Sequence, residues 1–126
     1  EPSPTTVLLM AAARRDFFLT VQHGQFYQGK PVIGYDLPGF GDELCGLPYL
    51  PRLIAKARAK LVGSMGDDII YCCENDRRFF RDHGNIHPAD FLRVVWAAGD
   101  SDPKVYDYVR QRTLSVSSAV PDNEQM

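Results

Sequence analysis

Apolar side chains recur at helical spacing between residues 50 and 62, the most strongly patterned stretch of the chain. The positions that share one face of a helix with 3.6 residues per turn are Leu50, Leu53, Ile54, Ala57, Leu61 and Val62. Pro51 suits a first turn, where a missing N–H breaks no hydrogen bond, and Gly63 suits a helix end. The pattern predicts an amphipathic helix whose apolar face contacts the rest of the core.

The N-terminal residues 6–22 also predict a helix, with Thr5 or Thr6 at its start and Gly24 after its end. Its first two turns are apolar on all sides. Such a helix is either buried on several sides or lies against a partner. We expect core packing.

Three more helices are expected in the second half of the chain. The first is capped by Asn75 or Asp76, and the second covers residues 88–98. The third is capped by Ser101 or Asp102, has Pro103 at its first position and extends to about residue 112. The serine-rich residues 113–126 are expected to form a loosely ordered tail that could dock on a partner.

Glycine and proline make regular structure sparse in a long loop over residues 25–46. Residues 68–73 include Ile69, Ile70 and Tyr71, which favour extended backbone, so they are expected to supply at most one strand of a two-stranded ribbon. The predicted fold class is therefore mainly α. We expect residues 1–126 to form a small single-domain bundle of about five helices around a helical core over residues 47–112.

Composition and charge narrow the range of partners. The net charge of −2 gives no overall attraction to nucleic acid or to an anionic membrane. No apolar run approaches the ~20 residues of a membrane span. Because of the net charge we predict no nucleic-acid partner, and because of the net charge and the short apolar runs we predict no membrane partner. Three cysteines, two of them adjacent, cannot all pair within the chain, which favours a reducing compartment and predicts a cytoplasmic protein.

The helix over residues 50–62 is basic on the side away from its apolar face. Arg52, Lys56 and Lys60 follow at steps of four and the helix contains no acid. Like charges at this spacing repel by a few tenths of a kcal/mol per pair, so acidic groups should face them. Cations held on a rigid helix suit a carboxylate or a phosphate, and arginine adds a bidentate fork. The candidate ligand-binding residues are Arg52, Lys56, Arg58, Tyr71, Cys73, Asp76 and Arg77.

The competing interpretation is that Asp76 only caps a helix while the cations pair with neighbouring acids on a solvated surface. The sequence also contains residues for two other chemistries. His83 and His87 with the adjacent cysteines could bind zinc, but Gly84 interrupts the helix and the cysteines lack Cys-x-x-Cys spacing. A thiol nucleophile with His83 as its base would need a geometry that the sequence does not fix. We predict no metal and no cofactor.

Two segments, LPRLIAKARA over residues 50–59 and YCCENDRRFF over residues 71–80, resemble a bacterial family of unassigned role, domain of unknown function 5069. The resemblance covers about residues 36–110. Its recurring positions are matched here by Pro51, Arg52, Lys56, Arg58, Gly63, Tyr71, Cys73, Asp76, Phe79 and Phe80. This chain has Ala55 where the family usually has an acid, and Glu74-Asn75 where it commonly has Pro-Leu. The resemblance implies a small helical fold and no particular activity.

Two functions follow as hypotheses. The first is a soluble binding or accessory protein that contacts a protein partner, or forms a homo-oligomer, through the N-terminal helix and the tail. The alternative is a small enzyme or ligand-binder that acts on an anionic small molecule with a carboxylate or phosphate group. The sequence leaves open whether the protein is an enzyme.

Overall fold

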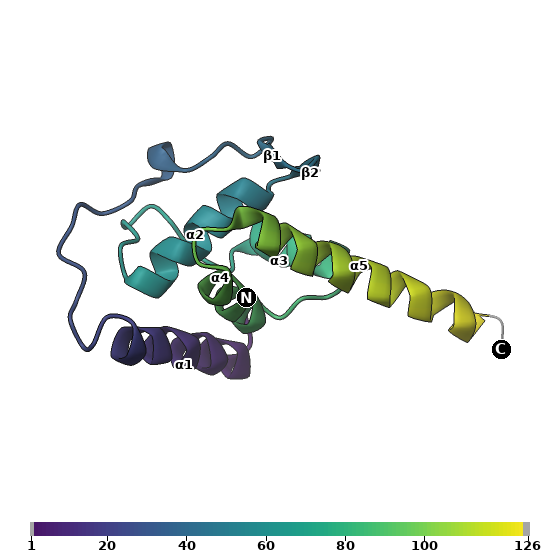
Figure 1. Cartoon of the computed structure of the whole chain (residues 1–126), viewed down its shortest axis with the longest axis horizontal. Coiled ribbons are helices and arrows are strands. Elements are labelled where there is room, and N and C mark those ends of the chain that lie inside the picture. Colours follow the sequence, from purple (N-terminus) through teal and green to yellow (C-terminus); the bar gives the residue numbers. More distant parts are fainter. Residues whose placement is uncertain (1, 125–126) are drawn as a thin grey trace.

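Over residues 2–124 the chain folds into five α-helices and one short hairpin (Figure 1). The computed structural model describes residues 2–124, and side chains over residues 2–116. In chain order the elements are α1 (Pro4–Thr20), a 3-10 turn (Gly34–Asp36), β1 (Glu43–Leu44), β2 (Leu47–Pro48), α2 (Leu50–Val62), α3 (Glu74–Asp82), α4 (Pro88–Ala98) and α5 (Asp102–Glu124). The predicted mainly α class with about five helices is confirmed.

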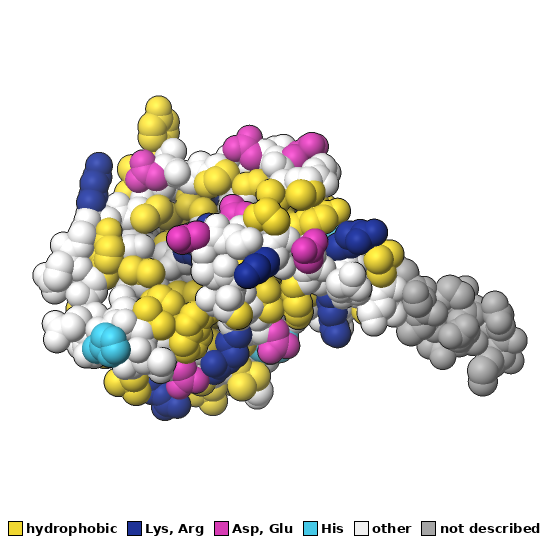
Figure 2. Space-filling view, viewed as in Figure 1, with side chains coloured by type: hydrophobic (Ala, Val, Ile, Leu, Met, Phe, Trp, Pro, Cys, Tyr) yellow, Lys and Arg dark blue, Asp and Glu magenta, His cyan; other side chains and the backbone are white. Residues whose placement is uncertain are grey.

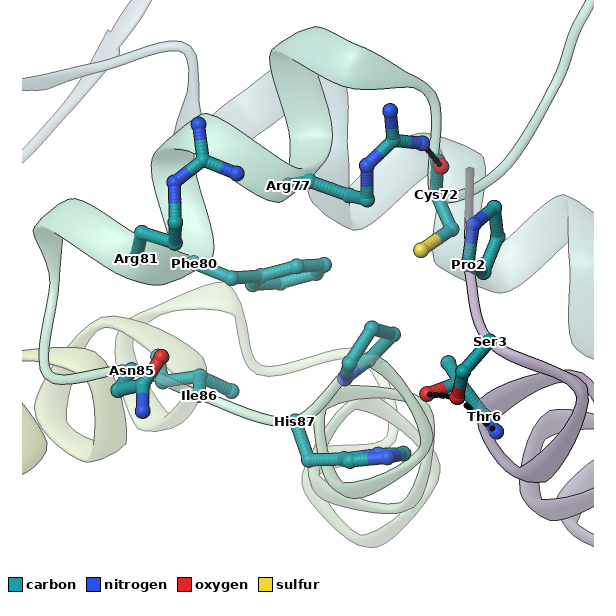
Figure 3. A pocket seen from close by; sticks show the side chains of 11 residues that line it. Pro2, Ser3, Thr6, Cys72, Arg77, Phe80, Arg81, Asn85, Ile86 and His87 are labelled. Atoms are coloured by element: carbon teal, nitrogen blue, oxygen red, sulfur yellow. Dashed lines mark hydrogen bonds between the residues drawn. The ribbon is translucent and has the colours of Figure 1, made fainter.

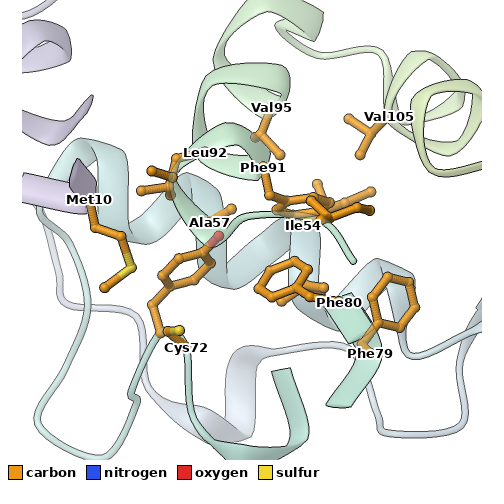
Figure 4. Close-up of a cluster of buried hydrophobic side chains, with 14 of the residues drawn as sticks. Met10, Ile54, Ala57, Cys72, Phe79, Phe80, Phe91, Leu92, Val95 and Val105 are labelled. Atoms are coloured by element: carbon orange, nitrogen blue, oxygen red, sulfur yellow. The ribbon is translucent and has the colours of Figure 1, made fainter. Parts of the chain in front are cut away.

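Helix α2 has the predicted bounds and supplies the centre of the core. Its predicted apolar face is buried at every position except Val62, which is half-buried. Helix α4 packs against α1, α2 and α5. The close-up in Figure 4 shows Phe80 of α3 and Phe91 of α4 meeting over α2, with ring centroids 5.3 Å apart. Apolar burial around α2 therefore joins all five helices in one cluster.

Helix α1 is held to the C-terminal end of α2 by polar side chains. The Arg14 Nε donates to the carbonyl of Lys60 at 3.1 Å, and the Gln22 Nε2 donates to the carbonyl of Val62 at 2.8 Å. Carbonyls in the last turn of a helix have no partner within the helix, so these contacts satisfy them.

The expectation that α1 is buried on several sides is wrong. Only Met10 and Ala13 of this helix are buried, and Leu8 is 70% exposed. The reason is that the neighbouring helices cover α1 along one side only, so its other apolar side chains stay at the surface. Figure 2 shows hydrophobic side chains along the lower edge of this face, where α1 lies.

The predicted two-stranded ribbon exists, but its expected position is wrong. It consists of β1 and β2, joined by Cys45 and Gly46 at φ of 53° and 83°. Two consecutive residues at positive φ form the tight turn that matches the twist of a hairpin. Residues 68–73 form turns instead, because Cys72 takes a φ of 73° and its N–H bonds to a carboxylate rather than to a strand.

The last helix is longer than predicted. Helix α5 does not end near residue 112 but continues to Glu124, so residues 113–124 of the expected tail are helical. Residues 104–120 contain no glycine and no proline, so nothing in this stretch stops the helix. The end of α5 projects beyond the other helices (Figure 1). Over residues 2–124, none of the helices combines the length and the apolar character that a bilayer span requires.

Candidate functional site

A buried ion pair lies where α2 meets the start of α3. The Lys56 Nζ of α2 is 2.7 Å from the Asp76 Oδ2 of α3. The Lys56 side chain is 5% exposed and that of Asp76 is fully buried. Burying two charges is costly unless each has a close partner and further hydrogen bonds. This pair meets that condition through Asp76.

Asp76 accepts hydrogen bonds from groups on both sides of the junction. Its Oδ2 accepts the backbone N–H of Cys72 at 2.9 Å and that of Cys73 at 3.3 Å, and its Oδ1 accepts the hydroxyl of Tyr49. The prediction that Asn75 or Asp76 caps α3 is wrong. Cys73 is the capping residue, and Asp76 lies three residues further on, from where its carboxylate turns back to the start of the helix.

Two residues around Asp76 have strained backbones. Tyr49 and Cys72 have φ of 76° and 73°, a region that side chains with a Cβ rarely adopt. Both residues donate a hydrogen bond to the Asp76 carboxylate. The charged hydrogen bonds offset the strain, so Asp76 holds the α2–α3 junction together.

The ionisable groups around the junction predict a loss of stability at alkaline pH. Burial, then the hydrogen bond and charge of Asp76, raises the pKa of Tyr49 far above its ordinary 10.0. Burial raises the pKa of Tyr71 and of Cys72 as well. A group with a raised pKa holds its proton more tightly in the folded state. Its contribution is complete below the unfolded-state pKa and is lost as the pH rises above it.

We therefore expect the free energy of unfolding to fall as the pH rises above the ordinary thiol and phenol values of 9.0 and 10.0. Lys60 acts in the opposite direction, because burial and then Arg14 lower its pKa. Urea unfolding at about pH 7, 9 and 10.5 measures the balance. The Tyr49→Phe variant lacks this phenol, so its free energy of unfolding should fall less steeply with rising pH. A stability that stays level or rises over this range would contradict the assignment.

Beside the ion pair is a pocket of about 200 Å³ that includes Arg52, Lys56 and Cys73 of the predicted site. The Lys56 Nζ also donates to the Cys73 Sγ at 3.4 Å. The Arg52 guanidinium lies over the Phe40 ring, 4.2 Å from its centroid, and donates from Nη1 to the carbonyl of Pro38. We call this space the Cys73 pocket. It has no excess of positive charge, because Asp76 pairs with Lys56 and Asp68 also lines it.

The structure does not bring the other predicted residues to this pocket. Arg58 forms an ion pair with Asp102 at 2.6 Å and donates to the carbonyl of Gly99. Tyr71 is buried and donates from its hydroxyl to the carbonyl of Pro88 at 2.8 Å. The residues of the single predicted site therefore do not lie together. Arg58 and Tyr71 lie outside the Cys73 pocket, and their side chains contact other helices or loops of the fold.

Arg77 belongs to a second pocket, of about 340 Å³, between α3 and the starts of α1 and α4. Figure 3 shows Arg77 and Arg81 extending from α3 above the Phe80 ring, with His87 on the opposite wall. Arg77 donates from Nη1 to the carbonyl of Cys72 at 2.8 Å, which fixes its position. We call this the arginine pocket; its lining residues are Pro2, Ser3, Thr6, Cys72, Arg77, Phe80, Arg81, Asn85, Ile86, His87 and Pro88.

The arginine pocket presents hydrogen-bond donors and positive charge. None of its described lining side chains is a carboxylate, and among the described residues neither arginine has an ion-pair partner. The His87 Nδ1 accepts the N–H of Ala89, so in the neutral ring the proton is on Nε2, a donor. Helices α1 and α4 both begin here, and helix N-termini carry partial positive charge.

Sequence reasoning missed Tyr49 and Arg81 as site residues. Arg77 and Arg81 are four residues apart on a nine-residue helix, so they share a face, and this spacing is present in the sequence. Tyr49 precedes α2 with a φ of 76°, so no helical spacing in the sequence indicates that it contacts Asp76.

The two histidines weighed as metal ligands have other contacts. His83 stacks on Phe79 with ring centroids 4.1 Å apart, and His87 caps α4. Within the part of the chain that the structure describes, no three His, Cys, Asp or Glu side chains gather as a set of metal ligands.

Comparison with known proteins shows the family of this chain. The model of a domain of unknown function, number 5069, matches residues 41–120, so the chain belongs to that family. The match begins and ends further along the chain than the expected range of 36–110. It does not test the bacterial origin that the resemblance implies, which stays a prediction. Searches of curated proteins and of solved structures gave no match.

Proposed function

We propose that this protein binds a small anionic molecule whose carboxylate or phosphate group lies between Arg77 and Arg81. The observation that carries the proposal is a pocket with two guanidinium groups and no carboxylate among its described lining residues. An uncompensated pair of cations in a concave site attracts anions from solution. The proposal keeps the ligand class expected from the sequence but moves its site from α2 to α3.

The charge balance of the two pockets supports this choice. In the Cys73 pocket, Lys56 is neutralised by Asp76, and Arg52 shares the lining with Asp68. An anion there would meet as many negative groups as positive ones. In the arginine pocket an anion meets two guanidinium groups and, among the described side chains, no carboxylate. Arg77 uses Nη1 on the carbonyl of Cys72, which leaves its other N–H groups for a ligand.

The apolar part of the arginine pocket narrows the ligand class. Phe80 and Ile86 lie below the two guanidinium groups in Figure 3. Pro88 is a third apolar lining residue. A ligand that joins an anionic group to a small ring or short alkyl group would use both parts of the pocket. Phenyl phosphate and benzoate are simple probes of this class. We propose binding only and assign no reaction to the site.

Thermal unfolding with each probe tests the proposal. A ligand that binds only the folded state at a hundred times its Kd stabilises the protein by about 2.7 kcal/mol, which corresponds to several degrees in Tm. We expect phenyl phosphate to raise the Tm of the parent protein. Replacing both Arg77 and Arg81 by glutamine should abolish the shift.

Arg78→Gln is the matched control. Arg78 is on the same helix and carries the same charge, but it lies outside the arginine pocket and faces Glu74 at 3.8 Å. This variant should keep the full shift. An equal loss of the shift in Arg78→Gln, or no shift in the parent with any probe, would overturn the proposal. Inorganic phosphate alone shows how much of the shift comes from the anionic group.

Other expectations from the sequence stay predictions. A protein partner or a second copy would have exposed apolar side chains of α1 to contact, but nothing in the described structure indicates what covers them. We infer a reducing, cytoplasmic setting from the free thiols of Cys45, Cys72 and Cys73. Redox-state labelling of the thiols in cell extract tests that inference.

A further inference from the structure

We infer that a groove between α1 and the C-terminal end of α2 binds a small amphiphile, an alkyl chain that ends in a carboxylate or a similar anionic group. This groove of about 360 Å³ shares no lining residue with the arginine pocket, so the inference does not rest on the proposed function. Small-molecule pockets have volumes of about 300–1,000 Å³, so the groove has room for a chain as well as an anionic group. We call it the α1 groove.

The apolar wall of the α1 groove comes from one side of α1 and from the loop after it. Val7, Ala11 and Phe18 are four and seven residues apart, so they lie on one side of the helix over a length of about 16 Å. Met10 also lines this wall, and Phe26 lies against Phe18 with ring centroids 4.9 Å apart. Val7 is 48% exposed and Phe26 is 69% exposed. An alkyl chain in the groove would remove this apolar surface from water, which stabilises the complex.

The remaining lining residues of the α1 groove are cations, Arg14, Arg15 and Lys60. None of the described lining side chains is a carboxylate. Arg14 and Lys60 have no ion-pair partner among the described residues. Arg15 is 4.0 Å from Asp16, whose carboxylate lies closer to Arg93, at 2.9 Å. Unlike the Cys73 pocket, this groove therefore has an excess of positive charge.

Arg14 and Lys60 are both half-buried, and their charges lie close together. The Arg14 Nε donates to the carbonyl of Lys60 at 3.1 Å, which holds the guanidinium beside the end of α2. Burial, and then the charge of Arg14, lower the pKa of Lys60. The two cations therefore repel, and an anionic group beside them would offset that repulsion. Since the rest of the groove is apolar, an anion with an alkyl chain fits it better than a free inorganic anion.

An NMR titration of the isotope-labelled protein with octanoate, hexanoate and 1-octanol tests the inference. Octanoate should shift the backbone amide signals of Ala11, Phe18 and Phe26 until they saturate. Because its chain is buried, octanoate should bind more tightly than hexanoate, by about two- to fourfold for each additional CH₂ group. Amide shifts that do not saturate, or an equal Kd for octanoate and hexanoate, would contradict the inference.

The variant Lys60→Gln measures the contact with the anionic group. It should weaken octanoate binding roughly fivefold, the scale of one partly exposed charge contact, and leave the Kd of 1-octanol within about twofold. The control is Lys104→Gln, which removes an exposed lysine of α5 outside the groove and should change neither Kd. Arg15→Gln, at an exposed position, gives a second removal of charge if the Lys60 variant is unstable. Circular dichroism and thermal unfolding show that each variant is folded.

The variant in which both Arg77 and Arg81 are replaced by glutamine separates the two sites. It should bind octanoate as tightly as the parent protein while losing the Tm shift with phenyl phosphate. The inference is wrong if this variant loses octanoate binding, or if Lys60→Gln weakens octanoate and 1-octanol equally. Either result leaves the test of the arginine pocket with phenyl phosphate unaffected.

Discussion

Replacing Asp76 by asparagine is expected to lower the free energy of unfolding by about 3–5 kcal/mol. The change leaves the Lys56 ammonium buried without a counter-charge, because Asp76 Oδ2 is its carboxylate partner at 2.7 Å. It also weakens the hydrogen bonds that the Tyr49 hydroxyl and the amides of Cys72 and Cys73 donate to this carboxylate. Two of these donors, Tyr49 and Cys72, have positive φ. Urea unfolding followed by circular dichroism measures the effect.

Two further variants separate the ion pair from other causes. Asp82→Asn changes an exposed residue of the same helix and should alter stability by less than about 0.5 kcal/mol. Adding Lys56→Met to Asp76→Asn removes the unpaired charge and should restore part of the loss. If Asp76→Asn costs no more than Asp82→Asn, the junction does not depend on this pair.

Replacing Gly84 by alanine is expected to cost about 2–4 kcal/mol, for two separate reasons. Gly84 has a φ of 94°, which disfavours any residue with a Cβ. A Cβ built at Gly84 would also lie 2.6 Å from the carbonyl oxygen of Arg112, in the backbone of α5. The Arg112 Nε donates to the carbonyl of Gly84 at 2.8 Å, so α5 has little freedom to move away.

Substitutions at two other glycines separate the cost of positive φ from the cost of the steric clash with α5. Gly24 has a φ of 76° but nothing near a built Cβ, so Gly24→Ala should show the cost of positive φ alone, about 1–2 kcal/mol. Gly41 has neither constraint, and Gly41→Ala should leave stability within about 0.5 kcal/mol. Chemical unfolding of the three variants checks the order. A Gly84→Ala variant no less stable than Gly24→Ala would show that α5 does not press on this loop.

The helices could be predicted from the sequence because apolar spacing and end residues specify them locally. Helix α2 has the predicted bounds, since its apolar face, Pro51 and Gly63 all indicate the same element. The hairpin could not be located in this way. Its turn places Cys45 at positive φ, and cysteine is not a residue whose presence indicates that conformation. The sequence underestimates the length of α5, because the serine-rich composition after residue 112 predicts a loosely ordered tail where the helix in fact continues to Glu124.

The candidate site was divided because consecutive residues on a helix point in different directions. Asp76 and Arg77 are neighbours in sequence, but successive residues of a helix are rotated by about 100° around its axis. Asp76 therefore faces α2, while Arg77 faces the starts of α1 and α4. Cys72 and Cys73, which precede α3, also line different pockets. Which cations stay unpaired depends on these tertiary contacts, which the sequence pattern does not contain.

The most direct measurement of the proposed function is an NMR titration with phenyl phosphate that follows the Nε–H signals of the arginine side chains. The signals of Arg77 and Arg81 should shift together and saturate, because both guanidinium groups line one pocket. The Arg78 signal, from the same helix but outside that pocket, should stay in place. Shifts of all exposed arginines in proportion to ligand concentration, or no shift at Arg77 and Arg81, would contradict the proposal.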